Sequence, residues 1–417
     1  MGLRAVSRPN DLSSTTKINH SIFFYPSVST FTSAAVTQTM EKLKNPFVIY
    51  GYKGAEYFCD RKEETERLVT ALENERNVVL ISPRRVGKTG LIHHVFERIG
   101  KKEQGARCFY MDINATRNMS QFIQLLAKTV VGKVDSFSQA ALRKITTFFA
   151  NYRPTVSFDE LTGLPTFSIA VAPDRQEESL KHIFEYLKQS GKRVYIAIDE
   201  FQQIAEYPEK GAEALLRSYI QFLPNVYFIF AGSSQHLMSE MFLSAKRPFY
   251  QSSQIMSLPL IEICEYETFA NKWLKQEGIE ISDGDFRYLY DMVDGQTWYV
   301  QCILNRLYEN GEVIDKRAIV QAVENIINEQ EDAFINYCKS LTDNQVALLT
   351  AIAKEKGVSS VLSHEFIRKY SLPAASSVSI ALKALQKRDF VHDFNGKIIV
   401  YDRFFSIWLR KETEPFR

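Results

Sequence analysis

Hydrophobic and polar positions between residues 63 and 260 follow two alternating patterns. Short runs that are apolar on both faces, such as "NVVLI" at 77–81, are typical of strands inside a parallel sheet. Between these runs, apolar positions three or four residues apart predict amphipathic helices. Strands are expected at 77–81, 106–113, 193–199, 225–232 and 254–258, and helices at 63–74, 88–99, 120–130, 177–189 and 212–222. This alternation predicts an α/β core with right-handed crossovers.

Two segments depart from this alternation. Residues 131–175 contain a helical stretch and then "TVSFDELTGLPTFSIAV", which predicts an inserted hairpin of two strands joined by a turn at Thr162 and Gly163. The first 39 residues hold thirteen Ser or Thr, few charges and no helical period. We therefore expect residues 1–44 to form a disordered or non-native tail. Met40 is then the natural start, or the residues before it are dispensable.

The pattern changes again after residue 260. Helical spacing fills 265–341, which predicts a small helical bundle. Thr342 and Gln345 stand at capping-box spacing and mark the start of another helix. A break at Leu372 and Pro373 separates two further helices, and the segment "VHDFNGKIIVY" predicts a hairpin turning at Asn395 and Gly396. Helix-turn-helix followed by a hairpin is typical of a winged helix.

Composition narrows the class of protein without naming a partner. The 417 residues include 51 Lys or Arg against 49 Asp or Glu, and 45% are hydrophobic, as in ordinary soluble globular proteins. The five cysteines lie far apart, which excludes the paired spacing of a zinc or redox motif. No apolar run approaches the ~18 residues of a membrane span. We expect a cytoplasmic protein with reduced thiols and no membrane contact.

The segment "SPRRVGKT" follows the first predicted strand and opens the next helix. Backbone N–H groups at such a helix start hold phosphate without burying an unpaired charge. Gly87 permits the tight turn, Lys88 reaches the β and γ phosphates of ATP, and Thr89 offers its hydroxyl to Mg²⁺. Ser82 stands where glycine is common, which serine tolerates at negative φ. The expected nucleotide-binding residues are Ser82, Pro83, Arg84, Arg85, Val86, Gly87, Lys88, Thr89 and Gly90.

Polar residues also follow two later strands. Asp199 and Glu200 end a buried strand, where two like charges are costly unless they have a task; the alternative is an acidic surface turn. We expect Asp199 to hold Mg²⁺ through water and Glu200 to orient the attacking water. The next strand ends in "AGSS", so Ser233 or Ser234 emerges at the same edge, within reach of the γ phosphate or the water. Because open sheets bind ligands at the carboxyl ends of their strands, one nucleotide site is predicted.

Three arginines are further candidates. Arg84 and Arg85 lie in the loop and would neutralise phosphate; the alternative is that both are merely solvated. Arg247, in "AKRPF" after the fourth strand, is a candidate catalytic arginine finger acting on a neighbouring subunit of a homo-oligomer. The alternative for Arg247 is an ordinary charged loop.

With these motifs in place, the chain resembles the ATPases described mainly from archaea and bacteria that belong to the AAA-like signal-transduction NTPases called STAND. The resemblance covers about 45–410. It rests on "NPF" and "YFCDRKEE" before the loop, on "SPRRVGKT", "IDEFQQI", "AGSS" and "RPFYQ", and on the closing "YDRFFSIWL".

The resemblance implies an ASCE/AAA-like P-loop NTPase core with an extra strand between the loop strand and the Walker B strand. It also implies Glu200 as catalytic acid, a helical lid and a winged helix. The sequence departs from the family pattern at Ser82, at Gln251, where arginine is frequent, and at Thr297, where proline is usual. The expected domains are 1–44 tail, 45–260 ATPase core, 261–341 lid and 342–417 winged helix.

These features predict a switch that binds and hydrolyses ATP with Mg²⁺ and relays its nucleotide state to the winged helix. Two alternatives stay open: a non-hydrolysing, nucleotide-dependent scaffold for a protein partner, and a DNA-binding regulator. A kinase built on the same loop is a further alternative, against which Glu200 beside Asp199 and the absence of an acceptor-pocket signature argue. Residues 342–417 carry twelve Lys or Arg against eight Asp or Glu. This small surplus leaves duplex DNA and a protein partner as candidate ligands of the winged helix.

Overall fold

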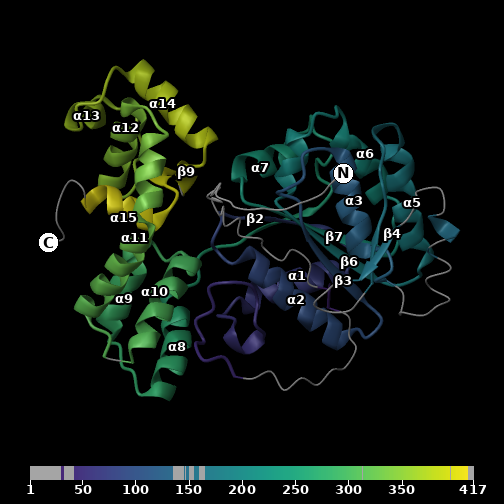
Figure 1. Cartoon of the computed structure of the whole chain (residues 1–417), viewed down its shortest axis with the longest axis horizontal. Coiled ribbons are helices and arrows are strands. Elements are labelled where there is room, and N and C mark those ends of the chain that lie inside the picture. The colour runs from purple at the N-terminus through teal and green to yellow at the C-terminus, as the bar shows by residue number, and fades with distance from the viewer. Residues whose placement is uncertain are drawn as a thin grey trace, which may run out of the picture.

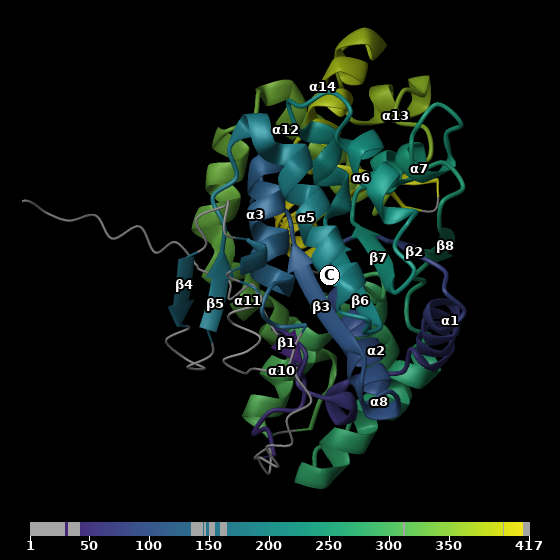
Figure 2. The ribbon, with the colours of Figure 1, turned by 90° about the vertical axis from the view of Figure 1, so that its right-hand side faces the viewer.

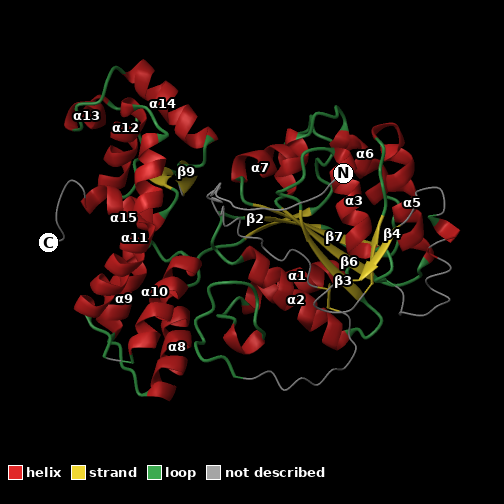
Figure 3. Cartoon of the chain, in the orientation of Figure 1, coloured by secondary structure: helices red, strands yellow, loops and turns green. Residues whose placement is uncertain are grey.

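The computed structural model describes residues 30–31, 42–134, 145, 147–149, 155–158, 165–311, 313–394 and 396–411. Figure 1 shows these residues in two lobes, with the main sheet and its covering helices in one and α8 to α15 in the other. Figure 3 shows that the second lobe is almost entirely helical apart from one hairpin. No helix in the described ranges is both long enough and apolar enough to cross a membrane.

The main sheet confirms the predicted parallel α/β core. Its order within the described residues is β1-β3-β6-β7-β2-β8, and every neighbouring pair except β1–β3 is parallel. The strands are β1 Thr30–Phe31, β2 Val78–Ile81, β3 Arg107–Asp112, β6 Val194–Asp199, β7 Val226–Gly232 and β8 Gln254–Ser257. β3 and β6 end in register at Asp112 and Asp199, and β2 and β7 end at Ile81 and Gly232. The carboxyl ends of these four strands therefore share one edge.

Helices cover both faces of this sheet because its central strands are apolar on both sides. Val78 and Leu80 of β2 pack with α1 (Lys62–Glu73) and α2 (Lys88–Lys102), whereas Val79 and Ile81 belong to the core on the opposite face. That opposite core contains α3 (Met119–Val130), α5 (Gln176–Gln189), α6 (Ala212–Ile220) and α7 (Gln235–Leu243). Figure 2 shows α3 and α5 lying together away from α1 and α2.

The predicted inserted hairpin is present as β4 (Thr155–Phe158) and β5 (Pro165–Ser168), which pair antiparallel. Phe167 of β5 is buried in the core that contains α3 and α5. The hairpin is therefore attached to the lobe that contains the main sheet. The predicted turn at Thr162 and Gly163 lies outside the described residues.

One strand was not predicted. Thr30 and Phe31 form β1 and pair antiparallel with Phe109 and Cys108 of β3. This corrects the expectation that no part of the first 39 residues takes regular structure. Because β3 would otherwise present unpaired N–H and C=O groups at the sheet edge, it accepts an extended segment whatever the hydrophobic pattern of that segment. The rest of 1–41 lies outside the described residues.

The second lobe begins after β8 and confirms the predicted winged helix. Thr342 and Gln345 form the predicted capping box, and Val378 and Leu385 are buried in the core. The predicted turn of the wing contains Gly396 at φ 77°, while Asn395 lies outside the described residues. The helices and strands of the second lobe are α8 Ile263–Leu274, α9 Asp283–Met292, α10 Thr297–Asn310, α11 Lys316–Lys339, α12 Asp343–Lys354, α13 His364–Lys369, α14 Ala375–Lys387, β9 Val391–Phe394, β10 Lys397–Val400 and α15 Arg403–Lys411.

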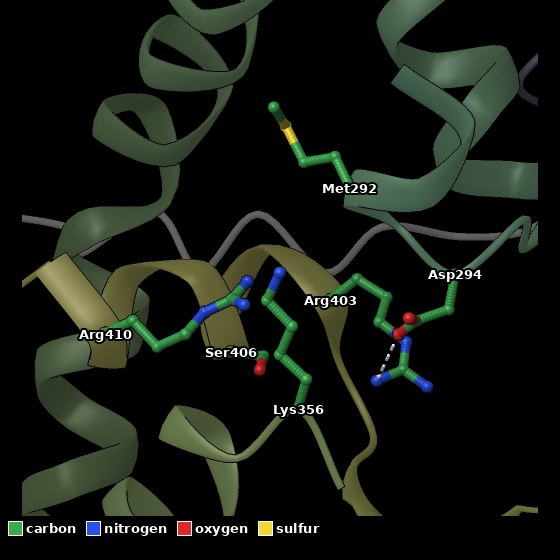
Figure 4. Close-up of a pocket in the computed structure, with 6 residues that line it drawn as sticks. All are labelled: Met292, Asp294, Lys356, Arg403, Ser406 and Arg410. Carbon is green, nitrogen blue, oxygen red and sulfur yellow. Dashed lines mark ion pairs between the residues drawn. The ribbon is translucent and has the colours of Figure 1, made fainter. Parts of the chain in front are cut away.

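The helices expected to form a lid and those of the winged helix share one hydrophobic core. That core runs without interruption from Tyr266 in α8 to Leu409 in α15. A polar contact joins the same parts: buried Arg403 of α15 forms an ion pair of 3.1 Å with Asp294, between α9 and α10. Figure 4 shows this pair at a small pocket between the two parts. A displacement of the lid helices would therefore carry the winged helix with it.

Candidate nucleotide site

The phosphate loop has the backbone that its sequence requires. Ser82 follows β2, is fully buried, and is not one of the residues of positive φ. Serine is therefore tolerated at this position, as the sequence predicted for negative φ. Gly87 lies at φ 97° and caps α2, a conformation that favours glycine. The loop turns directly into the N-terminus of α2, where free N–H groups attract anions.

Lys88 is held inside this loop. Its Nζ donates hydrogen bonds to the carbonyl oxygens of Ser82 at 2.9 Å and Pro83 at 3.0 Å. The side chain is 6% exposed, and burial lowers the pKa of Lys88 while Asp199 and Glu200 oppose that shift. A buried ammonium group held by two loop carbonyls, and near the charges of two carboxylates, is placed to meet a phosphate.

Thr89 and Asp199 come together from different elements. The Thr89 hydroxyl donates to Asp199 Oδ2 at 2.9 Å, and the Tyr110 hydroxyl donates to the same oxygen at 2.8 Å. The backbone N–H of Glu200 donates to Asp199 Oδ1 at 3.0 Å. A hydroxyl and a carboxylate side by side are the hard oxygen donors that suit Mg²⁺ together with substrate phosphates. No cluster of three or more His, Cys, Asp or Glu suited to a metal occurs in the described part of the chain.

Glu200 and Ser233 meet at the ends of β6 and β7. Glu200 adopts a left-handed backbone, φ 56°, which turns its side chain off the strand end. Ser233 Oγ donates to Glu200 Oε2 at 2.7 Å, and the side-chain amide of Gln202 donates to the same oxygen. Gln202 was not among the predicted site residues. Its only sequence signal is its place two residues after Glu200 in "IDEFQQI".

Asp112 is a third acid at this edge and was also missed. It ends β3 in register with Asp199, and its Oδ1 accepts a hydrogen bond from the Asn114 N–H at 2.8 Å. Burial, with the charges of Asp199 and Glu200, raises the pKa of Asp112 to about 6. The available signal was the position of Asp112 at the end of the predicted strand "ARCFYMDI". Three carboxylates therefore gather where the strands end.

Arg84 faces two parts of the molecule at once. Its Nε donates to Ser233 Oγ at 3.1 Å and lies 3.9 Å from Glu200 Oε1. The same guanidinium group forms an ion pair of 3.4 Å with Asp389, after α14, and lies 5.9 Å from the ring centroid of Tyr401. A loop residue thus contacts both the acidic edge of the sheet and the winged helix.

Arg85 joins the loop to the lid and the start of α15. Its guanidinium group binds Asp402 at 3.0 Å, donates to the Tyr299 hydroxyl, and lies 4.4 Å from the Trp298 ring centroid. The backbone carbonyl oxygen of Arg85 accepts a hydrogen bond from the backbone N–H of Trp298 at 3.0 Å. Arg85 has φ 65°, so these contacts hold a backbone that is strained for a residue with a side chain.

The next residue of the loop, Val86, is bound from two sides. The Thr297 hydroxyl donates to the Val86 carbonyl at 3.3 Å, and Arg61 donates to it at 3.1 Å. Thr297 stands where the family pattern usually has proline, and its hydroxyl makes a contact that proline lacks. The start of α10 is thereby attached to the phosphate loop through both backbone and side chains.

Arg247 contacts residues outside the candidate nucleotide site. Its guanidinium group pairs with Glu213 at 3.2 Å and Glu240 at 3.6 Å, so the structure does not bring it to the phosphate loop of the same chain. Gln251, the other departure near it, has φ 49° and an exposed side chain. Hydrogen bonds link Thr89, Asp199, Glu200 and Ser233 to one another. Lys88 is bonded to the loop carbonyls and is influenced by the charges of Asp199 and Glu200.

Comparison with protein families gives two matches along the chain. An ATPase domain found predominantly in Archaea matches residues 58–303, and a probable winged helix domain matches 332–411. Two ATP-binding proteins of Methanocaldococcus jannaschii are similar. MJ0147 is 25% identical over 270 residues, which is 60% of this chain and 70% of that protein. MJECL15 is 24% identical over 276 residues, which is 60% of this chain and 73% of that protein.

Solved structures share the fold at low identity. The Walker-type ATPase PABY2304 of Pyrococcus abyssi superposes with a TM-score of 0.59 at 18% identity, covering 88% of this chain and 99% of that one. The ORC2 protein of Aeropyrum pernix, solved with ADPNP and ADP, gives 0.54 at 15% identity, covering 88% and 96%. The ORC1 protein of the same organism, solved with DNA, gives 0.51 at 13% identity, covering 89% and 97%. These likenesses support one arrangement of a P-loop core followed by a winged helix.

Proposed function

Because the chain belongs to the family of ATPase domains found predominantly in Archaea, we propose that it is a Mg²⁺-dependent switch that binds and hydrolyses ATP. In this proposal its nucleotide state is relayed to the winged helix. We assign that family, and this chain with it, to the AAA-like signal-transduction NTPases called STAND. The relatives named as ATP-binding proteins and the neighbour solved with ADPNP and ADP are consistent with this nucleotide.

The observation that carries the proposal is the meeting of three groups at one sheet edge. Lys88 lies in the loop, Thr89 and Asp199 share a hydrogen bond of 2.9 Å, and Ser233 is bonded to Glu200 at 2.7 Å. The loop N–H groups and Lys88 would bind the phosphates. Thr89 and Asp199 would hold Mg²⁺, directly and through water, and the cation would neutralise charge that develops on the phosphates.

Glu200 is the residue proposed to orient the attacking water and to accept its proton. In this arrangement its Oε2 already accepts from Ser233 and Gln202. These two donors hold the carboxylate in one orientation but compete with a water for the same oxygen. The geometry supports a resting site that becomes active when Ser233 or Gln202 turns toward the nucleotide, so we expect slow turnover in the absence of a partner.

The relay is proposed to run through the loop itself. Arg85 and Val86 are bonded to the lid at Trp298 and Thr297, and the lid shares its core with the winged helix. A change of loop conformation on nucleotide binding would therefore move the whole second lobe against the first. Such a readout requires contacts that differ between the two nucleotide states.

The test is steady-state ATP turnover with Mg²⁺, comparing the wild type with Lys88→Ala and Glu200→Gln. We expect measurable turnover in the wild type, loss of nucleotide binding and turnover in Lys88→Ala, and loss of turnover with retained binding in Glu200→Gln. Wild-type turnover equal to that of Lys88→Ala, with nucleotide still bound, would remove hydrolysis and leave the nucleotide-dependent scaffold.

The surface of α14 favours a protein partner as the second candidate function of the winged helix. Its outward face carries Ser376, Ile380, Lys383 and Lys387, and Ile380 is 71% exposed. An exposed apolar side chain beside basic ones on the same helix face suits a protein surface better than a run of phosphates. Adding duplex DNA to the turnover assay separates the two: DNA stimulation that disappears in Lys383→Ala would favour DNA.

A further inference from the structure

Arg84 is the one loop residue whose side chain contacts both the acidic sheet edge and the winged helix in the described structure. We infer that Arg84 is an in-chain sensor of the γ phosphate, and that Asp389 of the winged helix competes with that phosphate for it. A nucleoside triphosphate would draw Arg84 away from Asp389, whereas a diphosphate would leave the pair intact. This inference rests on the proposed function and names how the nucleotide site is regulated.

The catalytic side of the sensor is a chain of hydrogen bonds. Arg84 Nε donates to Ser233 Oγ at 3.1 Å, and Ser233 Oγ in turn donates to Glu200 Oε2 at 2.7 Å. Arg84 therefore stabilises the orientation in which the Ser233 hydroxyl is bonded to Glu200 Oε2. That oxygen is the one proposed to accept the proton of the attacking water. A phosphate that binds the Arg84 guanidinium would free the Ser233 hydroxyl to reorient. Arg84 is thus a positioning residue that acts through Ser233.

The winged-helix side is an ion pair that can exchange. The Arg84 and Asp389 side chains are 41% and 63% exposed, and their closest N–O distance is 3.4 Å. Exposed ion pairs of this kind contribute little to stability. A phosphate carries more charge than one carboxylate and accepts the guanidinium in bidentate fashion, so it would win the competition. A reversible release requires a contact of this strength.

The neighbouring Arg85 makes a different kind of contact. Its side chain stacks on Trp298 and Tyr299 and pairs with Asp402, whose side chain is only 21% exposed. The backbone at Arg85 is also bonded to Trp298. We assign Arg85 as the fixed attachment of the second lobe and Arg84 as the releasable contact. Rotation about the Arg85 attachment would separate Asp389 from Arg84 without detaching the lid.

The experiment compares equilibrium binding of a non-hydrolysable ATP analogue and of ADP, both with Mg²⁺, to the full chain and to Asp389→Asn. Asp389 has φ 56°, a conformation that asparagine also accepts, so this substitution removes the charge with little strain. We expect the analogue to bind about two- to fivefold more tightly to Asp389→Asn, from the energy of an exposed pair. ADP affinity should stay unchanged.

Two controls separate this effect from general damage. Glu365→Gln removes an exposed acid of α13 and should alter neither affinity. Combining Asp389→Asn with Arg84→Ala should abolish the gain in analogue affinity. Without the Arg84 guanidinium group, Asp389 and the γ phosphate have no shared partner. A gain that is equal for both nucleotides, no gain at all, or a gain that persists without Arg84 would overturn the sensor while leaving ATP binding in place. A wild type that binds neither nucleotide would instead remove the proposed function itself.

Discussion

Gly87 is the loop residue whose type is dictated by backbone conformation. It lies at φ 97°, and a Cβ built there would meet nothing within 4 Å, so only the backbone opposes a side chain. We predict that Gly87→Ala destabilises the chain by about 1 kcal/mol or more and weakens nucleotide binding. Urea unfolding and nucleotide titration measure the two effects. Gly100→Ala, in the last turn of α2 and equally uncrowded, is the control and should stabilise by up to about 1 kcal/mol.

Asp112 gives the site a pH-dependent stability. Its folded pKa, about 6, lies above the ~3.9 of an unfolded aspartate, so the folded state favours the protonated form. Stability is then lost as pH rises through the window between these two values, by at most about 3 kcal/mol. We predict that Asp112→Asn is more stable than the wild type by about 1 to 3 kcal/mol at pH 8.

The difference between Asp112→Asn and the wild type should vanish below pH 4, where both side chains are neutral. Urea unfolding at several pH values, without Mg²⁺ or nucleotide, measures it. The side-chain oxygen of asparagine can still accept the 2.8 Å hydrogen bond from Asn114, so charge is the main change. A constant difference at all pH values would show that Asp112 is not the titrating group.

The residues of the candidate site differ in how readily the sequence predicts them. Lys88 and Thr89 follow a glycine after a buried strand, and Asp199 with Glu200 ends another, so both pairs could be predicted from strand ends alone. Asp112 also ends a strand but stands alone, and nothing in its neighbours marks it. Gln202 reaches Glu200 only because the chain turns at φ 56° after β6, a feature that hydrophobic periodicity does not report.

At the scale of elements, the predicted and observed strands agree where both faces of the strand are buried. Val78–Ile81 and Val226–Gly232 are buried throughout, which requires apolar residues at every position and makes these strands easy to predict. β1 is two residues long and is defined by the open edge of β3, so its own pattern carries no signal. Arg84 and Arg85 could be placed in the loop, but their partners Asp389 and Asp402 are 305 and 317 residues away and depend on tertiary packing.

Phe404 at the start of α15 packs this helix against α10. It is fully buried, with its ring centroid 5.0 Å from that of Tyr299 and 6.2 Å from that of Trp298 in α10. We predict that Phe404→Ala costs about 3 to 5 kcal/mol, because it leaves a cavity between the helices. Leu362→Ala, at a site 46% exposed, should change stability by less than about 0.5 kcal/mol.

Urea unfolding monitored by tryptophan fluorescence checks the Phe404 prediction, since Trp298 lies at the affected contact. Hydrogen exchange should also show faster exchange in α10 as well as in α15, because the two helices share the packed ring cluster. Loss of protection in α15 alone would mean that α10 is held by the ATPase lobe and not by the winged helix.

At the scale of the whole molecule, the hydrophobic core of the second lobe decides which parts of the chain fold together. The sequence predicts a boundary at residue 341 because a capping box begins there and the pattern restarts. The structure has the capping box, yet the hydrophobic cluster continues across it. A local helix signal marks where an element begins, whereas domain independence depends on which apolar faces are covered by later elements.

The lid is therefore predicted not to fold stably without the winged helix. Phe334 of α11 is 1% exposed because Phe405 and Trp408 of α15 cover it, at centroid distances of 5.2 and 5.9 Å. A chain ending at residue 341 would expose Phe334, Trp298 and Tyr299 together, an apolar patch that favours aggregation. We expect this truncated protein to elute as aggregates in size-exclusion chromatography and to lack cooperative melting of the lid.

The two outcomes of the truncation experiment distinguish whether the lid moves together with the winged helix or is an independent domain. If the second lobe is one body, only the full chain transmits a change at the phosphate loop, and Arg84 and Arg85 contact that body at Asp389 and Asp402. A monomeric 1–341 protein that melts within a few degrees of the full chain would make the lid an independent domain. The Arg85 contact with Trp298 would then fix the lid to the ATPase core, and the Arg84–Asp389 pair would be left as the contact that a nucleotide releases.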